Sequence, residues 1–383
     1  MINILKKKFS TLQKCLEYKE YDKIIAGLLG KKISLFTNTI KPQRYRYIML
    51  GSHGTGRNAF WHFLNASKAY PMRKFDIACI SRICFFSWRK IYGIVVDRDL
   101  SHLPDSMLFI NKLHKKVPVF VLVRDPISII RGGVNMTLAS NIIDGVNNVS
   151  IKEVLESYLQ SYDEMPHHFI FTTSPKQFEH ITKELVFIDM NDLSSQNAYN
   201  TMKKCCEKIG IYNIAESAGG EEFFSKKIAD SLALNIEKNF IFEKDEEMPI
   251  EVKIKILPFE NVLHKHFIIL ETLHSTYLPN RKISICLIGK NRKKAYRLLK
   301  QNEKALNIIL KKVESHTKNI KEKFDIYEAS KLDENDIVDY FKNDKNLYNK
   351  FRALFDYEMS SVKRNAPHIV ESWEFYKKFE EIT

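Results

Sequence analysis

Short apolar segments recur through the first half of the chain, and the stretches between them are long enough to hold a helix. The segments are Tyr45–Leu50, Tyr92–Asp97, Val117–Val123 and Glu184–Asp189. Segments of this length with few polar positions are typical of parallel strands that are buried on both faces. Strands that alternate with helices predict the α/β fold class, with an open parallel sheet, helices on both faces and ligands at the carboxyl ends of the strands. We assign this domain to residues 41–240.

The pattern changes in the second half of the chain. Short strand-like segments come first, at Val252–Leu257, His266–Leu270 and Lys282–Ile288, and residues 290–383 then read as mostly helix. We place a boundary near residue 240 and predict a C-terminal α+β extension, 241–383, that ends in helices. Its aromatic residues have spacings that suit a buried stripe, so we expect them to pack in a core. They are Tyr340, Phe341, Tyr348, Phe351, Phe355, Trp373, Phe375, Tyr376 and Phe379.

Residues 1–40 read as one or two amphipathic helices with a basic face. No segment approaches the roughly 18 uncharged apolar residues of a membrane-spanning helix, and the N-terminus lacks the apolar run of a secretory signal. We therefore expect a cytoplasmic protein. Its six cysteines form no C-x-x-C pair and no Cys/His box, so we expect reduced, packed thiols and no metal site.

Composition excludes several classes of protein. The chain has 383 residues, of which 44% are apolar, and it contains no internal repeat, so disordered, solenoid and collagen-like proteins are excluded. Lysine and arginine outnumber the acids by 60 to 46, and the net charge of +14 favours anionic partners such as nucleotides, acidic glycans or an anionic membrane face. No helix-turn-helix, RNP or zinc-finger pattern is present, so we expect no nucleic-acid partner.

A glycine-rich turn follows the first predicted strand and opens a helix. Glycines at 51, 54 and 56 permit positive φ and leave no Cβ in the way, so backbone N–H groups can surround a phosphate at the helix N-terminus. The predicted binding residues are Gly51, Ser52, His53, Gly54, Thr55, Gly56, Arg57 and Asn58. The alternative is a glycine-rich turn that binds no ligand.

This turn departs from the nucleotide-binding pattern G-x-x-x-x-G-K-[ST]. Arg57 stands in place of the lysine, and Asn58 stands in place of the hydroxyl residue that binds magnesium. Phosphoryl transfer from ATP relies on that magnesium ion. The substitutions therefore favour a donor that needs no metal over an ATP-dependent kinase.

Two further strand ends carry candidate chemistry. His102 follows the second strand in Ser-His-Leu-Pro, where it could accept a proton from a substrate hydroxyl, with Asp97 or Asp99 to orient it. Arg124 ends the third strand in Val-Leu-Val-Arg-Asp-Pro and offers a planar fork for a second phosphate. The alternatives are a helix-capping histidine and an arginine in a structural ion pair.

In order and spacing, these motifs resemble the sulfotransferases that use 3′-phosphoadenosine 5′-phosphosulfate (PAPS) as donor. The resemblance covers residues 45–212 and rests on the glycine loop, SHLP, VLVRDP, and DMNDL with its trailing KIG. It implies that His102 is the catalytic base and that Arg124 binds the 3′-phosphate. Gly54 stands where the family has its loop lysine, so His53 or Arg57 would supply that catalytic charge.

The resemblance also implies a second contact to the 3′-phosphate. In the family a serine lies eight residues after the arginine that ends the strand, but here that position is Gly132. Ser128, Arg131 and Asn135 are the candidate substitutes. PAPS is the implied donor, 3′,5′-ADP (PAP) is the product, and no metal is expected.

The resulting expectation is a sulfotransferase that moves a sulfuryl group to a hydroxyl of a glycan or other small acceptor. The content of Lys, Ile and Asn is typical of an AT-rich bacterial genome, which suggests a surface glycan or lipid-linked precursor as acceptor. The basic segment 289–297 is a candidate contact for an acidic acceptor, and peripheral contact with an anionic membrane is a related expectation. The alternatives are a P-loop kinase, a nucleotide-sugar-dependent transferase and a non-catalytic binding protein.

Overall fold

The computed structural model describes most of the chain between residues 45 and 382. The described residues are 45–72, 91–101, 106–107, 110–111, 113–146, 150–159, 169–225, 236–242, 250–257, 268–274, 276–278, 281–288 and 291–382. The helices predicted for residues 1–40 and the predicted base His102 lie outside these residues. The chain divides into two compact units: Met1–Ile130, Glu156–Lys226 and Glu334–Thr383 form the first, and Arg131–Leu155 and Lys227–Asp333 form the second.

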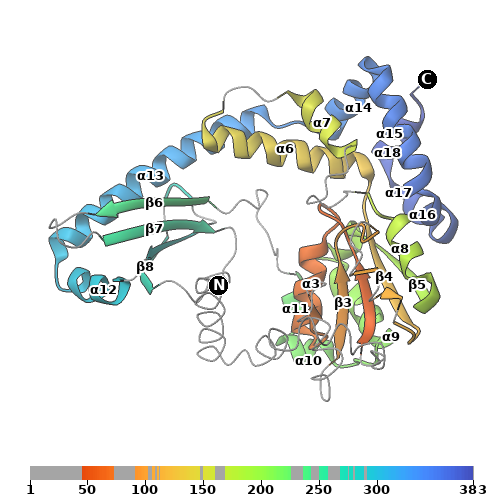
Figure 1. Ribbon diagram of the computed structural model, residues 1–383, viewed down its shortest axis with the longest axis horizontal. Helices are drawn as coiled ribbons and strands as arrows, with labels where there is room; N and C mark the ends of the chain where they lie inside the picture. Colours follow the sequence, from red (N-terminus) through yellow and green to blue (C-terminus); the bar gives the residue numbers. More distant parts are fainter. Residues whose placement is uncertain are drawn as a thin grey trace, which may run out of the picture. The chain divides into compact units, whose positions relative to one another are not determined.

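The first unit contains a five-stranded parallel sheet in the order β2-β3-β1-β4-β5 (Figure 1). The strands are Tyr45–Leu50 (β1), Pro71–Met72 (β2), Tyr92–Val96 (β3), Val117–Val123 (β4) and Thr182–Asp189 (β5). Every residue of β4 is buried, as its uninterrupted apolar sequence predicts. The α/β prediction is confirmed, and the four predicted strands are β1, β3, β4 and β5.

Strands β1 and β3 approach each other closely at Gly93, which faces Tyr47 in the parallel register. A Cβ on Gly93 would stand 2.0 Å from the Tyr47 ring. That ring is fully buried, its hydroxyl donates to the Ala69 carbonyl at 2.7 Å, and its centroid lies 5.7 Å from that of Phe120. The absence of a side chain at Gly93 therefore makes room for a ring that its surroundings hold in place.

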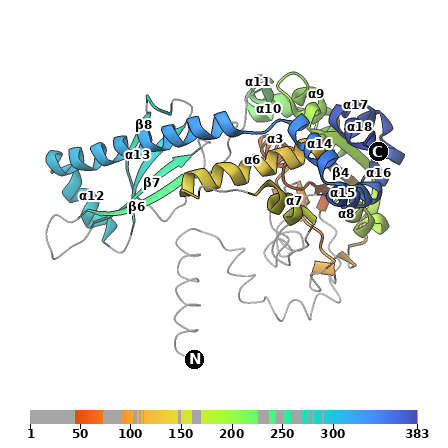
Figure 2. The same ribbon diagram turned by 90° about the horizontal axis from the view of Figure 1, so that it is seen from above.

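Helices cover both faces of this sheet (Figure 2). One group consists of α3 (Arg57–Ala66), α9 (Ala198–Lys208), α10 (Ile214–Ala218) and α11 (Glu222–Ser225), which contact one another. Phe60 of α3 packs edge-on against Phe120 of β4, with ring centroids 5.7 Å apart. The short helix α8 (Thr173–Gln177) precedes β5 along the chain.

The C-terminal helices belong to the same compact unit as the parallel sheet, although the sequence analysis assigned them to the extension. They are α14 (Glu334–Asn343), α15 (Lys345–Glu358), α16 (Ser360–Asn365), α17 (Pro367–Ser372) and α18 (Glu374–Glu380). Phe341, Phe351 and Phe379 are buried and pack ring against ring, so the predicted packing of the aromatic residues is confirmed for this group. Tyr340 and Phe375 are only half-buried.

Two carboxylates attach these helices to the strand ends. Asp125, just after β4, accepts hydrogen bonds from the backbone N–H groups of Phe375 and Tyr376, both at 3.1 Å. Asp189, at the end of β5, accepts a hydrogen bond from the Trp373 indole at 2.6 Å. The start of α18 is therefore fixed at the carboxyl edge of the sheet.

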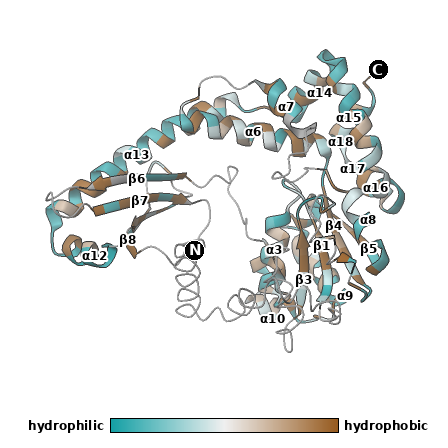
Figure 3. Cartoon of the chain, viewed as in Figure 1, coloured by the Kyte–Doolittle hydropathy of each residue, from teal (hydrophilic) through white to brown (hydrophobic). Residues whose placement is uncertain are grey.

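The second unit contains an antiparallel sheet in the order β6-β7-β9-β8. Its strands are Ile236–Phe242 (β6), Ile250–Leu257 (β7), Ile268–His274 (β8) and Lys282–Leu287 (β9). The core side chains of this sheet pack with residues of α12 (Arg292–Lys300) and α13 (Glu303–Ser330), and hydrophobic and hydrophilic residues alternate along α13 (Figure 3). The boundary predicted near residue 240 falls inside β6.

Helix α6 (Pro126–Asp144) begins in the first unit, and its later residues, from Arg131 onward, belong to the second. Helix α7 (Ile151–Leu159) follows it. In the part of the chain that the structure describes, no helix combines the length and the apolar character that crossing a membrane requires.

Candidate functional site

The strand order brings three predicted site elements to one edge of the parallel sheet. β1 lies between β3 and β4, so the loop after β1 is flanked by the residues that follow β3 and β4. From β1 the chain continues to β2 and β3 on one side, and it then crosses to β4 and β5 on the other side. Open α/β sheets bind ligands in the crevice where the strand order reverses in this way. The glycine loop, Asp97 and Arg124 all lie at this edge.

The glycine loop has the conformation that its sequence predicts. Gly54 and Gly56 have φ angles of 85° and 80°, in the left-handed region that favours glycine, and Gly56 is the N-cap of α3. The Thr55 hydroxyl donates to the Ser52 carbonyl at 2.8 Å, and both residues are buried. The N–H groups in the first turn of α3 and the positive end of its helix dipole therefore lie at the glycine loop. This arrangement is suited to binding an anion.

Arg124 reaches the glycine loop from the neighbouring strand. Its Nη1 donates to the Gly54 carbonyl at 3.1 Å. The same guanidinium lies near the Asp189 carboxyl and lowers the pKa of that group, although burial has the larger effect and raises it overall. Two elements that are 70 residues apart in the sequence, each suited to an anion, are therefore in direct contact.

Arg57, the first residue of α3, pairs with Asp97 at the end of β3. Arg57 Nη1 lies 2.8 Å from Asp97 Oδ2, and Arg98 Nε lies 3.1 Å from Asp97 Oδ1. Two guanidinium groups share one carboxylate, so the group keeps a net positive charge. The Arg57 side chain is 16% exposed, so an anion at the loop would meet a partly desolvated cation.

His53 lies on the glycine loop beside this group. Partial burial of its ring and the neighbouring Arg57 guanidinium lower the pKa of His53 below its ordinary value of 6.5, although the Asp97 carboxylate acts in the opposite direction. The imidazole is therefore neutral at pH 7. In that state it can offer one N–H donor to a ligand but no full charge.

Asp99 holds the start of the segment that leads to His102. Its carboxylate accepts hydrogen bonds from the Ser101 backbone N–H at 2.9 Å and from the Ser101 hydroxyl at 2.8 Å, and it also pairs with the Gln177 amide. Asp97 and Asp99, the two carboxylates expected to orient His102, thus both have other partners in the structure. The position of His102 itself is outside the described residues.

The predicted substitutes for the family's serine are engaged elsewhere. The Ser128 hydroxyl donates to Glu334 at 2.9 Å. The Asn135 amide exchanges two hydrogen bonds with the Leu332 backbone, which is a structural role. Arg131 is the first residue of the second unit and lies near Tyr327; burial raises the pKa of that hydroxyl, and the Arg131 charge acts in the opposite direction.

The predicted basic segment 289–297 largely coincides with α12 of the second unit. Ala295 and Leu299 are buried against the sheet, whereas Lys293, Lys294 and Arg297 are exposed. The first turn of α12 contains no acidic residue to complement the helix dipole. This face stays a predicted contact for acidic partners.

Sequence reasoning missed two features of the site. One is the pairing of Asp97 with Arg57, which are 40 residues apart. The other is the position of Trp373 against Asp189, 184 residues apart, at the end of the strand beside β4. Asp97 and Asp189 each stand at the end of an apolar run, which was the only signal in the sequence.

Comparison with known proteins gives one family match. The family model described as "Protein of unknown function (DUF2972)" matches residues 187–383, from the end of β5 to the C-terminal helices, and does not include the glycine loop. No sulfotransferase family matches, so that resemblance stays a prediction. No curated protein matches the chain.

Proposed function

The chain belongs to the DUF2972 family of proteins of unknown function, and we propose that it is a PAPS-dependent sulfotransferase. The observation that carries the proposal is the contact between Arg124 and the glycine loop at Gly54. A donor with one anionic group on the 3′ position and another on the 5′ position of its ribose needs two anion sites close to each other, as on neighbouring strand ends. The loop after β1 and the arginine after β4 supply such a pair.

The chemistry of the site favours a donor that binds without a metal ion. Asp97 is the carboxylate nearest to Arg57, and it is already neutralised by two guanidinium groups. Asn58 lacks the hydroxyl that would hold magnesium in an ATP-binding loop. These features support PAPS over ATP, so the P-loop kinase is the weaker alternative. A nucleotide-sugar-dependent transferase remains a second alternative.

In the proposed reaction an acceptor hydroxyl oxygen attacks the sulfur of PAPS in line with the leaving oxygen. The new S–O bond forms as the S–O bond to PAP breaks, and His102 takes the proton of the hydroxyl. Negative charge grows on the bridging oxygen of PAP. The N–H groups of the loop, with Arg57 or His53, would stabilise that charge, and a single donor of this kind contributes about two orders of magnitude in rate.

Ligand-dependent thermal stability tests the proposal directly. We expect 3′,5′-ADP at one hundred times its Kd to stabilise the protein by about 2.7 kcal/mol, and ATP with magnesium or a nucleotide sugar to give a much smaller shift. Arg124→Gln should abolish the shift. Lys208→Gln, which removes an exposed cation paired with Glu184, serves as the matched control and should leave it intact. A larger shift with ATP and magnesium than with 3′,5′-ADP would contradict the proposal.

The same measurement separates catalysis from binding. His102→Ala should abolish the release of 3′,5′-ADP from PAPS in the presence of an acceptor, and the stabilisation by 3′,5′-ADP should persist. A stable complex without turnover in the unmodified protein would instead favour the non-catalytic binding protein. That alternative is supported by Gly54, which stands where the family has its catalytic lysine.

The pH dependence of binding tests the place of His53. Its pKa is lowered in the free protein, and a bound phosphate should raise it, so binding takes up a proton. The affinity for 3′,5′-ADP should therefore rise as the pH falls through the range around 6.5, by about tenfold for each unit of pKa difference. Because the ligand's own phosphates also titrate in this range, His53→Gln is the reference. Titration calorimetry measures the affinity at each pH. If His53→Gln and the unmodified protein show the same dependence of affinity on pH, His53 does not contact the bound ligand.

A further inference from the structure

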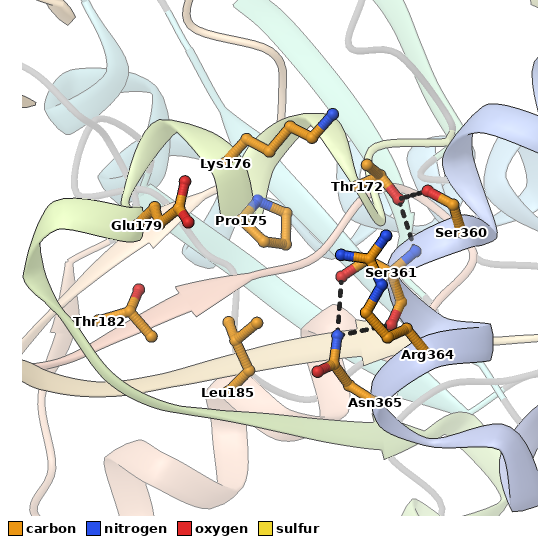
Figure 4. Close-up of a pocket in the computed structure, with 10 residues that line it drawn as sticks. All are labelled: Thr172, Pro175, Lys176, Glu179, Thr182, Leu185, Ser360, Ser361, Arg364 and Asn365. Atoms are coloured by element: carbon orange, nitrogen blue, oxygen red, sulfur yellow. Dashed lines mark hydrogen bonds between the residues drawn. The ribbon is translucent and has the colours of Figure 1, made fainter.

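A cavity of about 290 Å³ lies in the first unit between α8, the start of β5 and α16 (Figure 4). Its lining combines hydroxyl, amide and charged side chains with two apolar residues. The lining residues are Thr172, Pro175, Lys176, Glu179, Thr182, Leu185, Ser360, Ser361, Arg364 and Asn365. Leu185 precedes Asp189 by four residues, or roughly 13 Å along the strand. The cavity is therefore separate from the site at the carboxyl edge of the sheet.

Three hydroxyl groups of the lining already donate to backbone carbonyls. Thr172, Thr182 and Ser360 donate to the carbonyls of Glu358, Phe178 and Tyr357 at 2.8, 2.8 and 2.7 Å. Thr172 Oγ1 also accepts from the Ser361 backbone N–H at 3.0 Å and lies 3.2 Å from the Ser360 hydroxyl. The Thr182 hydroxyl, which already donates, can only accept a hydrogen bond from a ligand. Glu179 adds a carboxylate acceptor that forms no ion pair with any described residue. The end of the cavity at Glu179 and Thr182 thus suits a ligand with hydroxyl donors.

Two cations complete the lining. The Arg364 guanidinium, on α16, forms no ion pair with a described residue, and its planar fork suits a phosphate. Lys176 has its ammonium 3.3 Å from the Tyr357 hydroxyl and 4.7 Å from the centre of that ring. Figure 4 shows Arg364 and Asn365 on the side of the cavity opposite Glu179 and Thr182. Thr172 and Ser360 stand on the same side as Arg364, so only a group bound by Glu179 and Thr182 would lie at the other end (Figure 4).

The remaining wall is apolar. Pro175 is buried and Leu185 is half-buried, and both face the cavity between its charged ends (Figure 4). The C–H face of a sugar ring packs well on such a surface, and the volume is at the lower end of the range for small-molecule sites. We propose that this cavity binds a monosaccharide phosphate, with the phosphate on Arg364 and the sugar hydroxyls on Glu179 and Thr182.

Titration calorimetry of the full chain tests this site with glucose 6-phosphate, glucose and inorganic phosphate as separate probes. Glucose 6-phosphate should bind at least about tenfold more tightly than either fragment, because it fills both ends of the cavity. Arg364→Gln should weaken its binding by about 10- to 100-fold, the effect of a charge-assisted hydrogen bond. Glu179→Ala should weaken glucose 6-phosphate but leave inorganic phosphate unchanged.

The neighbouring lysine provides a matched control. Lys363 lies on the same helix, and its ammonium pairs with Glu380, outside the cavity. Lys363→Gln removes the same charge and should leave the affinity unchanged. Saturating 3′,5′-ADP should not displace glucose 6-phosphate, whatever the outcome for the proposed function. Any of three results would overturn the assignment: no heat of binding from glucose 6-phosphate at about 10 mM, the same loss of affinity in Arg364→Gln and Lys363→Gln, or displacement of glucose 6-phosphate by 3′,5′-ADP.

Discussion

Gly93→Ala is expected to lower the free energy of unfolding by about 3 kcal/mol or more, at the upper end of the effects of overpacking. The new Cβ would stand 2.0 to 2.5 Å from three atoms of the Tyr47 ring. The ring cannot move aside, since it is fully buried and its hydroxyl is bound to the Ala69 carbonyl. Either β1 and β3 separate, or Tyr47 leaves its pocket. Urea denaturation followed by circular dichroism measures the loss.

Gly132→Ala is the matched control for this substitution. Gly132 lies within α6, and a Cβ there meets no atom within 4 Å. Alanine in a helix interior is favoured over glycine by roughly 0.5 to 1 kcal/mol, so this variant should be at least as stable as the unmodified protein. The double variant Gly93→Ala with Tyr47→Leu should recover part of the loss. If Gly93→Ala alone is neutral, the packing of β1 on β3 differs from the description above.

Asp125→Ala is expected to cost about 3 kcal/mol and to loosen the C-terminal helices. Asp125 Oδ2 accepts from the backbone N–H groups of Phe375 and Tyr376, and Oδ1 accepts from that of Ile127 at 2.9 Å. Alanine would leave three donors at the starts of α18 and α6 without this acceptor, and the loss of a cap costs about 1 kcal/mol for each donor. Hydrogen exchange should become faster in α18. Unchanged exchange there would show that Trp373 alone holds the helix.

The pH dependence of this effect has a defined sign. Burial raises the pKa of the Asp125 carboxyl, although four backbone N–H groups act in the opposite direction. A carboxyl whose pKa is raised in the folded state contributes fully to the free energy of unfolding at a pH below its unfolded pKa. That contribution is lost as the pH rises through the folded pKa. Asp125→Asn does not titrate, so the difference in stability between it and the unmodified protein should narrow as the pH rises. If the difference in stability widens instead, the hydrogen bonds to the ionised carboxylate outweigh its burial in setting the pKa of Asp125.

Periodicity predicted most of the sheet because each strand of the first unit, except β2, contains a continuous apolar run. β2 has only two residues, and β6 begins with Ile236 followed by three exposed polar residues, so neither carries a clear pattern. The glycine loop was predictable because its conformation depends on local φ angles. The distant partners of Asp97, Asp125 and Asp189 were not predictable, since Arg57, Phe375 and Trp373 lie 40 or more residues away from them and only the folded chain brings them close.

The packing of residues 334–382 against the sheet has a consequence for synthesis. Because α18 is anchored to Asp125 and Asp189, the first unit needs segments from both halves of the sequence before its core is complete. The ribosome delivers those segments at about 5 to 20 residues per second, so β4 is made roughly 10 to 50 seconds before α18, which lies at its end. During that interval the half-made sheet is exposed, and it is the stage at which we expect chaperones to bind the nascent chain.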